Sequence, residues 1–340
     1  MSAGLRTNER RDDANATRGD TLAVVLEAPH RIAVRPVGLL APGDADVVVD
    51  VEWSGISAGT ERLLWSGRMN DFPGLGYPLV PGYESVGRVV EAGPASGRRV
   101  GERVFVPGSS GFRDVRGLFG GAAARLVVPG ARTVEIGPAL GDRGVLLALA
   151  ATAHHALTAG TEELARPGAS VERPALIVGH GALGRLLARL VLVAGGPPPV
   201  VWERDPARHP GAAGYAVVDP DADPRRDYAV VYDVSGDAAL IDALVARLRP
   251  NGVLVLAGFY RDPVRFEFAP AFMRNLRLRI AAEWRPEDLA AVHRLVAEGR
   301  LDLGGLITHS ASPRDADAAY QAAFGDATCI KMVLDWRSES

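Results

Sequence analysis

The sequence predicts an α/β protein in which a β-rich unit is followed by a doubly wound parallel sheet. Two patterns carry this prediction: short β-rich runs separated by Gly and Pro up to about residue 145, and strands that alternate with helices beyond it. A length of 340 residues suits two domains. We expect residues 21–145 together with 286–340 to form the first domain, residues 146–285 the second, and residues 1–20 a disordered tail.

Each element follows from local composition. The β-rich runs of the first domain are Ala23–Leu26, Ile32–Pro36, Asp46–Trp53, Gly87–Glu91, Arg103–Val106 and Ala124–Val128. An Ala/Leu-rich helix is expected next, over Val145–Ala159. The alternating elements after it are strands over Ala175–Val178, Val200–Glu203, Ala229–Val234 and Gly252–Ala257, and helices over Leu183–Ala194, Ala238–Leu248 and Glu287–Glu298. A strand-like run, Ile330–Trp336, lies near the end of the chain and is expected to return to the first domain.

The composition excludes several classes of protein. Lys and Arg total 38 against 41 Asp and Glu, so the formal net charge of −3 offers no general attraction for nucleic acid. The one cysteine, Cys329, rules out an intramolecular disulfide and a Cys-rich zinc site, and it fits a reducing, cytoplasmic location. Lys331 is the only lysine, so a lysine-based mechanism is not expected. No apolar run approaches the ~20 residues of a transmembrane helix.

A glycine-rich turn follows the expected strand over Ala175–Val178 and opens the next helix. It has the G-x-G-x-x-G pattern, whose glycines allow a tight turn and a close approach of pyrophosphate to a helix N-terminus. Glu203 ends the next strand, where a carboxylate binds ribose hydroxyls and favours NAD over NADP. An arginine beside that acid can instead bind the 2′-phosphate of NADP. Arg204 and Arg208 follow Glu203, so the choice between NAD and NADP stays open. The cofactor residues predicted for this Rossmann unit are Gly179, His180, Gly181, Ala182, Leu183, Gly184, Glu203, Arg204 and Ser235.

Several local sequences resemble the medium-chain dehydrogenase/reductase superfamily. They are Val51–Glu61, Pro81–Glu84, Val100–Val104 and the step Thr152-Ala153. The resemblance implies a GroES-like catalytic domain ahead of the Rossmann domain, with Thr152 under the nicotinamide. The chain departs from the zinc-dependent members, since Ser57, Tyr83 and Ala148 stand where zinc ligands are expected and the four-cysteine structural lobe is missing. The resemblance therefore implies a dehydrogenase that works without zinc.

Longer strings resemble one zinc-free family of this superfamily, the dehydrogenases that oxidise the 3-(1-hydroxyethyl) side chain of a chlorin to 3-acetyl in bacteriochlorophyll synthesis. These strings are Ser57–Arg62, Trp65–Arg68, Gly76–Glu84, Asp114–Ala122 and Thr152–Leu157. The resemblance implies an NAD-dependent enzyme with a chlorin substrate. Two alternatives stay open: a zinc-free, NADPH-dependent quinone or enone reductase of the same superfamily, and a non-catalytic dinucleotide-fold binding protein. The sequence also leaves the oligomeric state open, with a homodimer among the outcomes.

Alcohol oxidation needs a hydride acceptor and a route for the hydroxyl proton. Without zinc, a general base or a hydroxyl relay must take that proton. By the resemblance, Thr60 matches the position whose hydroxyl contacts the substrate alcohol, and Tyr83 stands at a former ligand position that faces the nicotinamide; the alternatives are a loop-capping hydroxyl and a space-filling ring. Glu84 matches a residue near the metal of the zinc enzymes and is either catalytic or a structural partner. His154 and His155 lie about 100° apart on their helix, so only one is expected to face the site, with His155 the candidate base or axial ligand to a chlorin magnesium.

Four arginines lie in loops that are expected to face the cleft. They are candidates to pair with a chlorin propionate, because a guanidinium fork suits a carboxylate. These residues are Arg62, Arg68, Arg113 and Arg116. The aromatic residues of the same loops that are candidates to line a wide apolar pocket are Trp65, Phe72, Phe112 and Phe119. The alternatives are solvated surface charges for the arginines and core packing for the rings.

Overall fold

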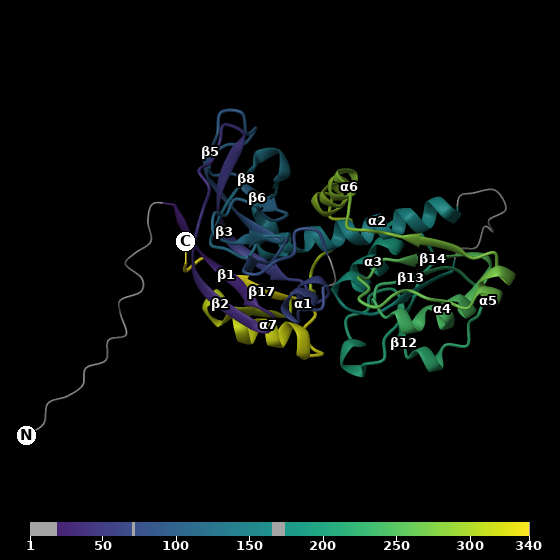
Figure 1. Cartoon of the computed structure of the whole chain (residues 1–340). Coiled ribbons are helices and arrows are strands. Elements are labelled where there is room, and N and C mark those ends of the chain that lie inside the picture. The colour runs from purple at the N-terminus through teal and green to yellow at the C-terminus, as the bar shows by residue number, and fades with distance from the viewer. Residues whose placement is uncertain (1–18, 70–71, 165–173, 340) are drawn as a thin grey trace, which may run out of the picture.

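The computed structural model describes residues 19–69, 72–164 and 174–339, which form two lobes (Figure 1). The first lobe is β-rich, and the second is a sheet with helices on both faces. Helix α2 (Leu147–Leu164) runs from the junction along the second lobe. The predicted tail over residues 1–20 lies outside the described residues as far as residue 18, and Asp20 is already the first residue of strand β1.

The described part of the first lobe contains two sheets. One has the strand order β2-β1-β4-β7, and the other has the order β16-β17-β3-β5-β6-β9, with β8 also paired to β3. The valines among residues 47–51 of β3 are buried in an apolar core that the strands of both sheets share. The elements of this lobe are β1 (Asp20–Ala28), β2 (Arg31–Gly38), β3 (Asp46–Ile56), α1 (Thr60–Trp65), β4 (Leu79–Val80), β5 (Ser85–Ala92), β6 (Arg103–Val106), β7 (Arg116–Gly117), β8 (Arg125–Pro129), β9 (Val134–Glu135), β16 (His309–Ala311), α7 (Ala316–Gly325) and β17 (Met332–Asp335).

The second lobe confirms the prediction of a doubly wound parallel sheet. Its strand order is β12-β11-β10-β13-β14-β15, and every neighbouring pair is parallel. The order reverses between β10 and β13, and in such sheets ligands bind outside the carboxyl ends of the strands at that point. The elements are β10 (Ala175–Val178), α3 (Ala182–Val193), β11 (Val200–Trp202), β12 (Ala216–Val218), β13 (Tyr228–Asp233), α4 (Ile241–Arg247), β14 (Leu248–Leu256), α5 (Phe268–Met273) and β15 (Arg277–Ile280). Helix α6 (Pro286–Ala297), which the sequence analysis assigned to the first domain, packs on α2.

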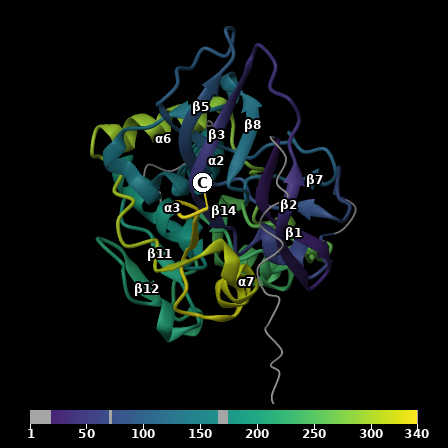
Figure 2. The same ribbon diagram turned by 90° about the vertical axis from the view of Figure 1, so that its left-hand side faces the viewer.

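The end of the chain returns to the first lobe. Strand β17 pairs antiparallel with β3, with Met332 opposite Ile56. Trp336 is fully buried after it and donates its indole N–H to the Ser54 hydroxyl at 2.8 Å. Figure 2 shows α7 beside the strands of the first lobe, although its residues follow the whole second lobe in the sequence. This return brings Lys331 next to Ile56.

Some elements of the structure are absent from the sequence prediction. Strand β15 escaped it because arginines alternate with its two apolar residues, a pattern that suits the edge of a sheet rather than its centre. Helix α4 begins at Ile241, later than expected, because Ala238–Leu240 form a 3-10 turn capped by Asp237, whose carboxylate accepts the Ala239 N–H at 3.0 Å. The missed edge strand matters for the site, since it leads directly into residues 281–284.

Candidate active site

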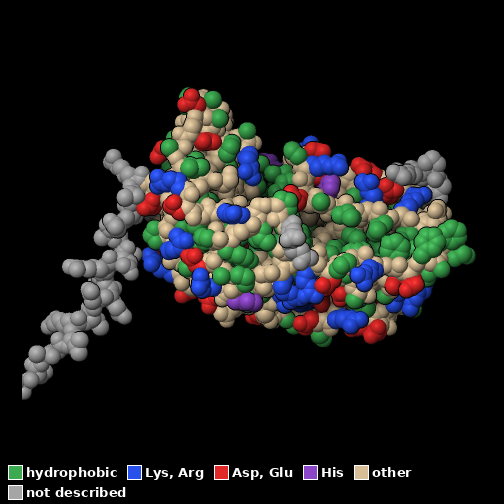
Figure 3. All heavy atoms as spheres, in the orientation of Figure 1, with side chains coloured by type: hydrophobic (Ala, Val, Ile, Leu, Met, Phe, Trp, Pro, Cys, Tyr) green, Lys and Arg blue, Asp and Glu red, His purple; other side chains and the backbone are tan. Residues whose placement is uncertain are grey.

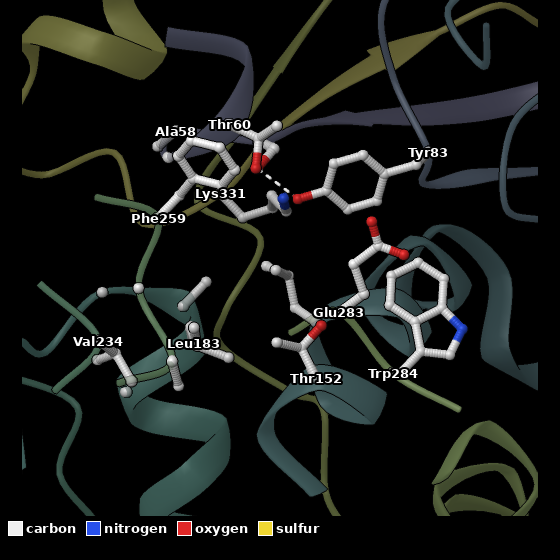
Figure 4. Close-up of a pocket in the computed structure, with 18 of the residues that line it drawn as sticks. Ala58, Thr60, Tyr83, Thr152, Leu183, Val234, Phe259, Glu283, Trp284 and Lys331 are labelled. Atoms are coloured by element: carbon white, nitrogen blue, oxygen red, sulfur yellow. Dashed lines mark hydrogen bonds between the residues drawn. The ribbon is translucent and has the colours of Figure 1, made fainter. Parts of the chain in front are cut away.

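A cavity of about 1270 Å³ lies between the two lobes. One part of it is lined by the ends of the parallel strands, and the other by loops of the first lobe and by residues 280–293. Figure 4 shows Leu183 and Val234 on one side, Tyr83 and Trp284 on the other, and Thr152 of α2 between them. Predicted site residues from both lobes therefore meet in one space.

The glycine-rich turn joins β10 to α3 as predicted from its pattern. Gly179 has a φ of +107°, a conformation that side-chain-bearing residues rarely adopt. A Cβ on Gly184 would lie 1.9 Å from the Gly179 carbonyl oxygen, so α3 packs against the turn only because this position is glycine. All six residues from Gly179 to Gly184 line the cavity. The turn leaves the N-terminus of α3 open to an anionic ligand.

His180 within this turn holds the loop through its ring. Its Nδ1 lies 2.6 Å from the Arg208 carbonyl oxygen and its Nε2 lies 2.9 Å from the Tyr215 hydroxyl. Burial lowers the pKa of His180 to about 4, so the ring is neutral at physiological pH. Nδ1 therefore donates to the carbonyl, and Nε2 accepts from the phenol. The imidazole is therefore fully used by the protein, and the His180 carbonyl oxygen accepts the Arg185 Nε–H at 3.0 Å.

Glu203 follows β11 and lines the cavity beside the glycine turn. Its carboxylate accepts the His180 N–H at 3.1 Å and the Asp205 N–H at 3.0 Å. Arg208 also lines the cavity, whereas Arg204 is exposed outside it, so Arg208 is the arginine that stands near the cofactor end. The role of Arg204 beside the cofactor stays a prediction.

The other predicted cofactor residues, Ser235 and Thr152, both line the cavity. Ser235 follows β13 and donates its hydroxyl to the Asp233 carboxylate at 2.6 Å. Thr152 lies on α2 and donates to the Ala148 carbonyl oxygen at 3.1 Å. Each hydroxyl is thus oriented by its own element.

Three hydroxyl side chains gather in the first-lobe part of the cavity, and we call Ser57, Thr60 and Tyr83 the hydroxyl cluster. The Ser57 hydroxyl lies 2.7 Å from the Tyr83 phenol oxygen, and Thr60 also hydrogen bonds to that phenol. Burial, together with the nearby carboxylates, raises the pKa of Tyr83 well above its usual range. The phenol therefore stays protonated and acts as a hydrogen-bond donor rather than as a base.

A buried carboxyl supports this cluster from behind. Glu61 is fully buried at the start of α1, where it accepts the Ser57 N–H at 2.9 Å and the Tyr320 hydroxyl at 2.6 Å. Burial raises the pKa of Glu61 to about 7, against the opposing effect of these hydrogen bonds. Glu61 thus links the turn before α1 to helix α7.

The raised pKa of Glu61 predicts a pH-dependent stability. The folded state holds the proton between pH 4.5 and about 7 while the unfolded state does not, so stability falls as pH rises through this window. The shift corresponds to about 3 kcal/mol. We expect the free energy of unfolding of the unmodified protein to fall by that amount relative to Glu61→Gln, as measured by urea titration. Glu287→Gln, at an exposed position, serves as the control, and parallel pH profiles for Glu61→Gln and the unmodified protein would contradict the prediction.

Glu84, a predicted catalytic residue, does not reach the cavity. It is fully buried behind β3, where a Cβ on Gly55 would lie 2.2 Å from its carboxylate, and it forms an ion pair with Lys331. Lys331 also donates to the Ile56 carbonyl oxygen at 3.1 Å and lines the cavity wall. The structural-partner alternative thus describes Glu84. The lysine that composition alone set aside is part of the site.

His154 and His155 bind the same residue, which corrects the expectation that only one of them faces a common site. Their Nδ1 atoms lie 2.7 and 2.9 Å from the two carboxylate oxygens of Asp288 on α6. Neither histidine lines the cavity. Although burial alone would raise the pKa of Asp288, the Arg285 N–H and the two imidazoles hold it below its usual range. The pair anchors α6 to α2, and His155 is not carried forward as a base or as a magnesium ligand.

The predicted substrate residues separate into two groups. Arg62 and Phe119 line the cavity, together with Phe72. Away from the cavity, Arg113 lies 3.4 Å from the Asp20 carboxylate, and Arg116 donates to the Leu75 carbonyl oxygen at 3.0 Å.

The remaining candidates also lie outside the cavity. Arg68 is exposed. The ring of Trp65 packs against the rings of His30 and Phe324, with centroid distances of 4.3 and 5.6 Å. Phe112 is buried in the core of the first lobe. Trp65 and Phe112 thus pack within the first lobe.

Sequence reasoning missed several residues of the cavity wall. Phe259 and Trp284 are two missed rings, and with Phe72, Phe119 and Tyr83, which the sequence had indicated, they form a continuous aromatic wall. The centroid distances are 6.1 Å for Phe259–Phe72, 6.2 Å for Phe72–Phe119, 5.4 Å for Phe119–Tyr83 and 6.1 Å for Tyr83–Trp284. The missed polar residues that line the cavity include Arg132, Tyr260, Glu283, His293 and Lys331. Recognition of β15 as a parallel strand would have pointed to Glu283 and Trp284, because ligands bind beyond the carboxyl ends of such strands.

The donor atoms of the hydroxyl cluster do not fit a zinc site. Zinc is held by Cys, His and carboxylate ligands, whereas this cluster offers a serine, a threonine and a protonated tyrosine. Two carboxyl groups adjoin the cluster in the sequence, but Glu61 accepts the Ser57 N–H and the Tyr320 hydroxyl, and Glu84 pairs with Lys331. In the described ranges, no group of three His, Cys, Asp or Glu side chains is placed to hold a metal ion.

Comparison with known proteins supports the described fold. Residues 43–138 match the alcohol dehydrogenase GroES-like domain. A short chain alcohol dehydrogenase of Escherichia coli, solved with NADH, superposes with a TM-score of 0.78 at 20% identity and covers 93% of this chain and 99% of its own. A dehydrogenase of Sinorhizobium meliloti, solved with NADP, has a TM-score of 0.77 at 24% identity and covers 94% and 100%. These likenesses establish the fold.

Two curated relatives match at much higher identity. The 2-desacetyl-2-hydroxyethyl bacteriochlorophyllide A dehydrogenase of Rhodobacter capsulatus is 56% identical over 319 residues, which cover 94% of this chain and 99% of the relative. The enzyme of the same name from Cereibacter sphaeroides is 54% identical, with the same coverage. Identity of this extent over nearly the whole of both sequences means that the chain belongs to the bacteriochlorophyllide dehydrogenase family of the medium-chain dehydrogenases/reductases.

Proposed function

We propose that the protein oxidises the 3-(1-hydroxyethyl) group of a bacteriochlorophyllide to 3-acetyl, with NAD as the hydride acceptor and without zinc. The observation that carries this proposal is the identity of 56% and 54% to two curated enzymes whose name states that substrate. The cavity supports it, because the aromatic wall offers flat apolar surface on the scale of a macrocycle beside the hydroxyl cluster. Arg62 and Arg132 add cations at the same cavity, and each suits a propionate.

The residues of the second lobe support a dinucleotide at the strand ends. The turn from Gly179 to Gly184 provides backbone N–H groups and the N-terminus of α3 for the pyrophosphate, and Thr152 lies where the two parts of the cavity meet. A bound nicotinamide supplies the hydride acceptor. The chain's own contribution at the reacting carbon is the hydroxyl cluster, in which the Tyr83 phenol donates a hydrogen bond to the alcohol oxygen while Ser57 and Thr60 hold the phenol in place.

The proposal is tested by a spectrophotometric assay of the purified protein with a 3-hydroxyethyl chlorin, NAD or NADP, and a chelator. We expect NAD-dependent conversion with a shifted chlorin absorption band that the chelator leaves unchanged. Conversion that the chelator abolishes would contradict the zinc-free part. Binding of NADPH without conversion would favour the reductase alternative, and failure to bind any dinucleotide would favour a non-catalytic protein.

Glu203 is expected to set the preference for NAD. A carboxylate at this position repels the 2′-phosphate of NADP, whereas Arg208 nearby would attract it. We expect Glu203→Gln to reduce the ratio of kcat/KM for NAD over NADP on the order of tenfold, equivalent to about 1.4 kcal/mol. Asp221→Asn, outside the cavity, is the matched control. An unchanged ratio would assign cofactor choice to other groups.

We also propose that two copies associate through the free edge of the second lobe. Among the described strands, none pairs with the outer edge of β15, which ends the sheet. The residues near it are exposed: 71% for Phe268, 66% for Phe272, 75% for Met273 and 74% for Ile280. Figure 3 shows hydrophobic side chains gathered at this end of the molecule. A second copy would cover both the edge and the patch, as an isologous contact does.

If two copies associate in this way, substitutions in the patch should change the oligomeric state. We expect the unmodified protein to sediment as a dimer and the double variant Phe272→Glu with Met273→Glu to sediment as a monomer, because two buried charges at a self-facing contact repel each other. Val100→Glu, which replaces a 66% exposed apolar residue of the other lobe, is the control. A monomer before substitution would contradict the proposal.

No helix in the described residues is both long and apolar enough to cross a membrane. We propose a cytoplasmic location for the reaction, which the single, unpaired Cys329 supports. An extract of the native host separated into cytoplasm and membrane would test this proposal by immunodetection.

A further inference from the structure

Alcohol oxidation releases a proton, and none of the residues assigned so far accepts it. Tyr83 stays protonated, Glu84 lies behind β3, and His155 is bound to Asp288 outside the cavity. We propose that Glu283 is the general base that removes the hydroxyl proton of the substrate. This assignment deepens the proposed function and rests on it, since it concerns the same oxidation in the same cavity.

Glu283 lies where a base for this reaction has to be. It follows β15 by three residues, precedes α6 and lines the cavity with an exposed side chain. Figure 4 shows its carboxylate pointing into the cavity between the Tyr83 and Trp284 rings, while the Tyr83 hydroxyl points toward Thr60. In the proposed pose, the alcohol oxygen accepts a hydrogen bond from the Tyr83 hydroxyl and its proton faces the Glu283 carboxylate.

The carboxylate is available for proton transfer. Within residues 19–69, 72–164 and 174–339, no hydrogen bond or ion pair engages the Glu283 side chain. Its neighbours in the cavity wall on this side are the Trp284 ring and the apolar Ala281 and Ala282. A carboxylate that is neither paired nor used by the fold keeps its lone pairs for a substrate proton.

The backbone indicates that glutamate is held at this position against a local preference. Glu283 has a φ of +51°, in the left-handed region that costs an L-residue of this kind roughly 1–2 kcal/mol. The other described non-glycine residues with positive φ are His30, Asn251 and Asn275, which are residue types that tolerate this region. Glycine would relieve the strain at position 283, and such strain is concentrated at functional sites.

Three other acid–base groups of the cavity are engaged by the protein, and one, His293, is not engaged by any described residue. Glu203, the other carboxylate among the described lining residues, accepts two backbone N–H groups at the cofactor end. Both ring nitrogens of His180 are hydrogen bonded within the loop, and Lys331 is paired with Glu84. His293 lines the cavity from the third turn of α6, so it is the competing base that the experiment has to separate from Glu283.

The step is balanced in protons and electrons. The O–H bond breaks and its proton passes to a Glu283 carboxylate oxygen, while the electron pair of that bond forms the second bond of the carbonyl. The carbon that bears the hydroxyl group loses its hydride to the bound nicotinamide, which is thereby reduced. The Tyr83 phenol donates to the oxygen throughout. Because the Glu283 side chain is exposed, the carboxylic acid then returns its proton to solvent.

Two variants test this role. Glu283→Gln keeps the shape of the side chain and removes the base, and it is expected to lower kcat by about 10²–10⁴-fold with little change in the KM for NAD. Glu283→Gly suits the positive φ, so it folds, and it leaves space for a small carboxylate. We expect added formate to restore part of the rate in Glu283→Gly but not in Glu283→Gln, whose amide fills the space. Glu287→Gln, an exposed acid in the first turn of α6, is the matched control, and binding of NADH is measured for every variant.

The outcomes separate this role from the proposed function. Rescue by formate confirms a missing base, because a residue that only supports the fold is not replaced by a free anion. A Glu283→Gln rate above about a tenth of the unmodified rate, or equal loss in His293→Asn with no formate rescue at position 283, would overturn the assignment. If the unmodified protein itself does not oxidise the chlorin alcohol, the proposed function fails; if it does and Glu283→Gln stays active, only the role of Glu283 fails.

Discussion

Replacing Lys331 by methionine is expected to lower the free energy of unfolding by about 3–5 kcal/mol. The lysine is 3% exposed and its partner Glu84 is fully buried, so the substitution leaves a carboxylate in the protein interior without its cation. Burial already raises the pKa of Glu84, and the attraction of Lys331 opposes that rise. Without the lysine the pKa rises further, so the loss of stability is larger at alkaline than at acidic pH.

Urea unfolding at two pH values measures this effect. The double variant Lys331→Met with Glu84→Gln removes the uncompensated charge and is expected to recover most of the loss, because replacing both partners of a buried pair is far less costly than removing one. Arg99→Met breaks the exposed pair with Glu102 and is the control, for which little change is expected. A small loss in Lys331→Met, similar to that of the control, would mean that water reaches Glu84.

Removal of the Tyr83 hydroxyl is expected to reduce kcat by about 10²–10³-fold, the usual effect of losing one donor to a reacting oxygen. The variant Tyr83→Phe keeps the ring and its edge-on contact with Phe119, whose centroid lies 5.4 Å away. The aromatic wall and the cofactor turn therefore remain, and binding of NADH should change little. Because burial raises the pKa of Tyr83, the rate should not follow ionisation of the phenol at any pH near neutrality.

Single-turnover measurement of NADH formation separates this chemical step from product release. Ser57→Ala is the matched comparison, since Ser57 hydrogen bonds to the phenol at 2.7 Å and acts on the substrate only through it. We expect a smaller loss of rate in Ser57→Ala than in Tyr83→Phe. Equal losses would indicate that Ser57 contacts the substrate directly. An unchanged rate in Tyr83→Phe would mean that the Tyr83 hydroxyl has no part in the reaction and that the ring only lines the cavity.

The cofactor end of the site could be predicted because its information is local. A turn that begins after a buried strand and opens a helix is encoded within about a dozen residues, and Gly179 to Gly184 all line the cavity as their pattern suggests. Glu203 comes from the adjacent parallel strand, whose carboxyl end has to lie beside the turn. Arg204 and Arg208 differ in exposure because the chain curves after β11, which spacing alone does not indicate.

The substrate end was much harder to predict because its residues come from distant segments. The direction of a loop side chain depends on the partner it finds: Arg113 turns to Asp20 and Arg116 to the Leu75 carbonyl. Asp288, 133 residues beyond His155, decides the orientation of both histidines. None of these partners is visible as a local pattern.

The sequence by itself determined the fold class, the dinucleotide turn and the family, because strand–helix alternation, glycine spacing and long shared strings are properties of neighbouring residues. Only the tertiary structure decided which polar groups share the cavity. Antiparallel pairing of β17 with β3 brings Lys331 to Glu84, and the edge strand β15 delivers Glu283 opposite Tyr83. The physical reason is that a residue's charge and proton affinity in the site depend on burial and on partners that meet only when remote strands pair.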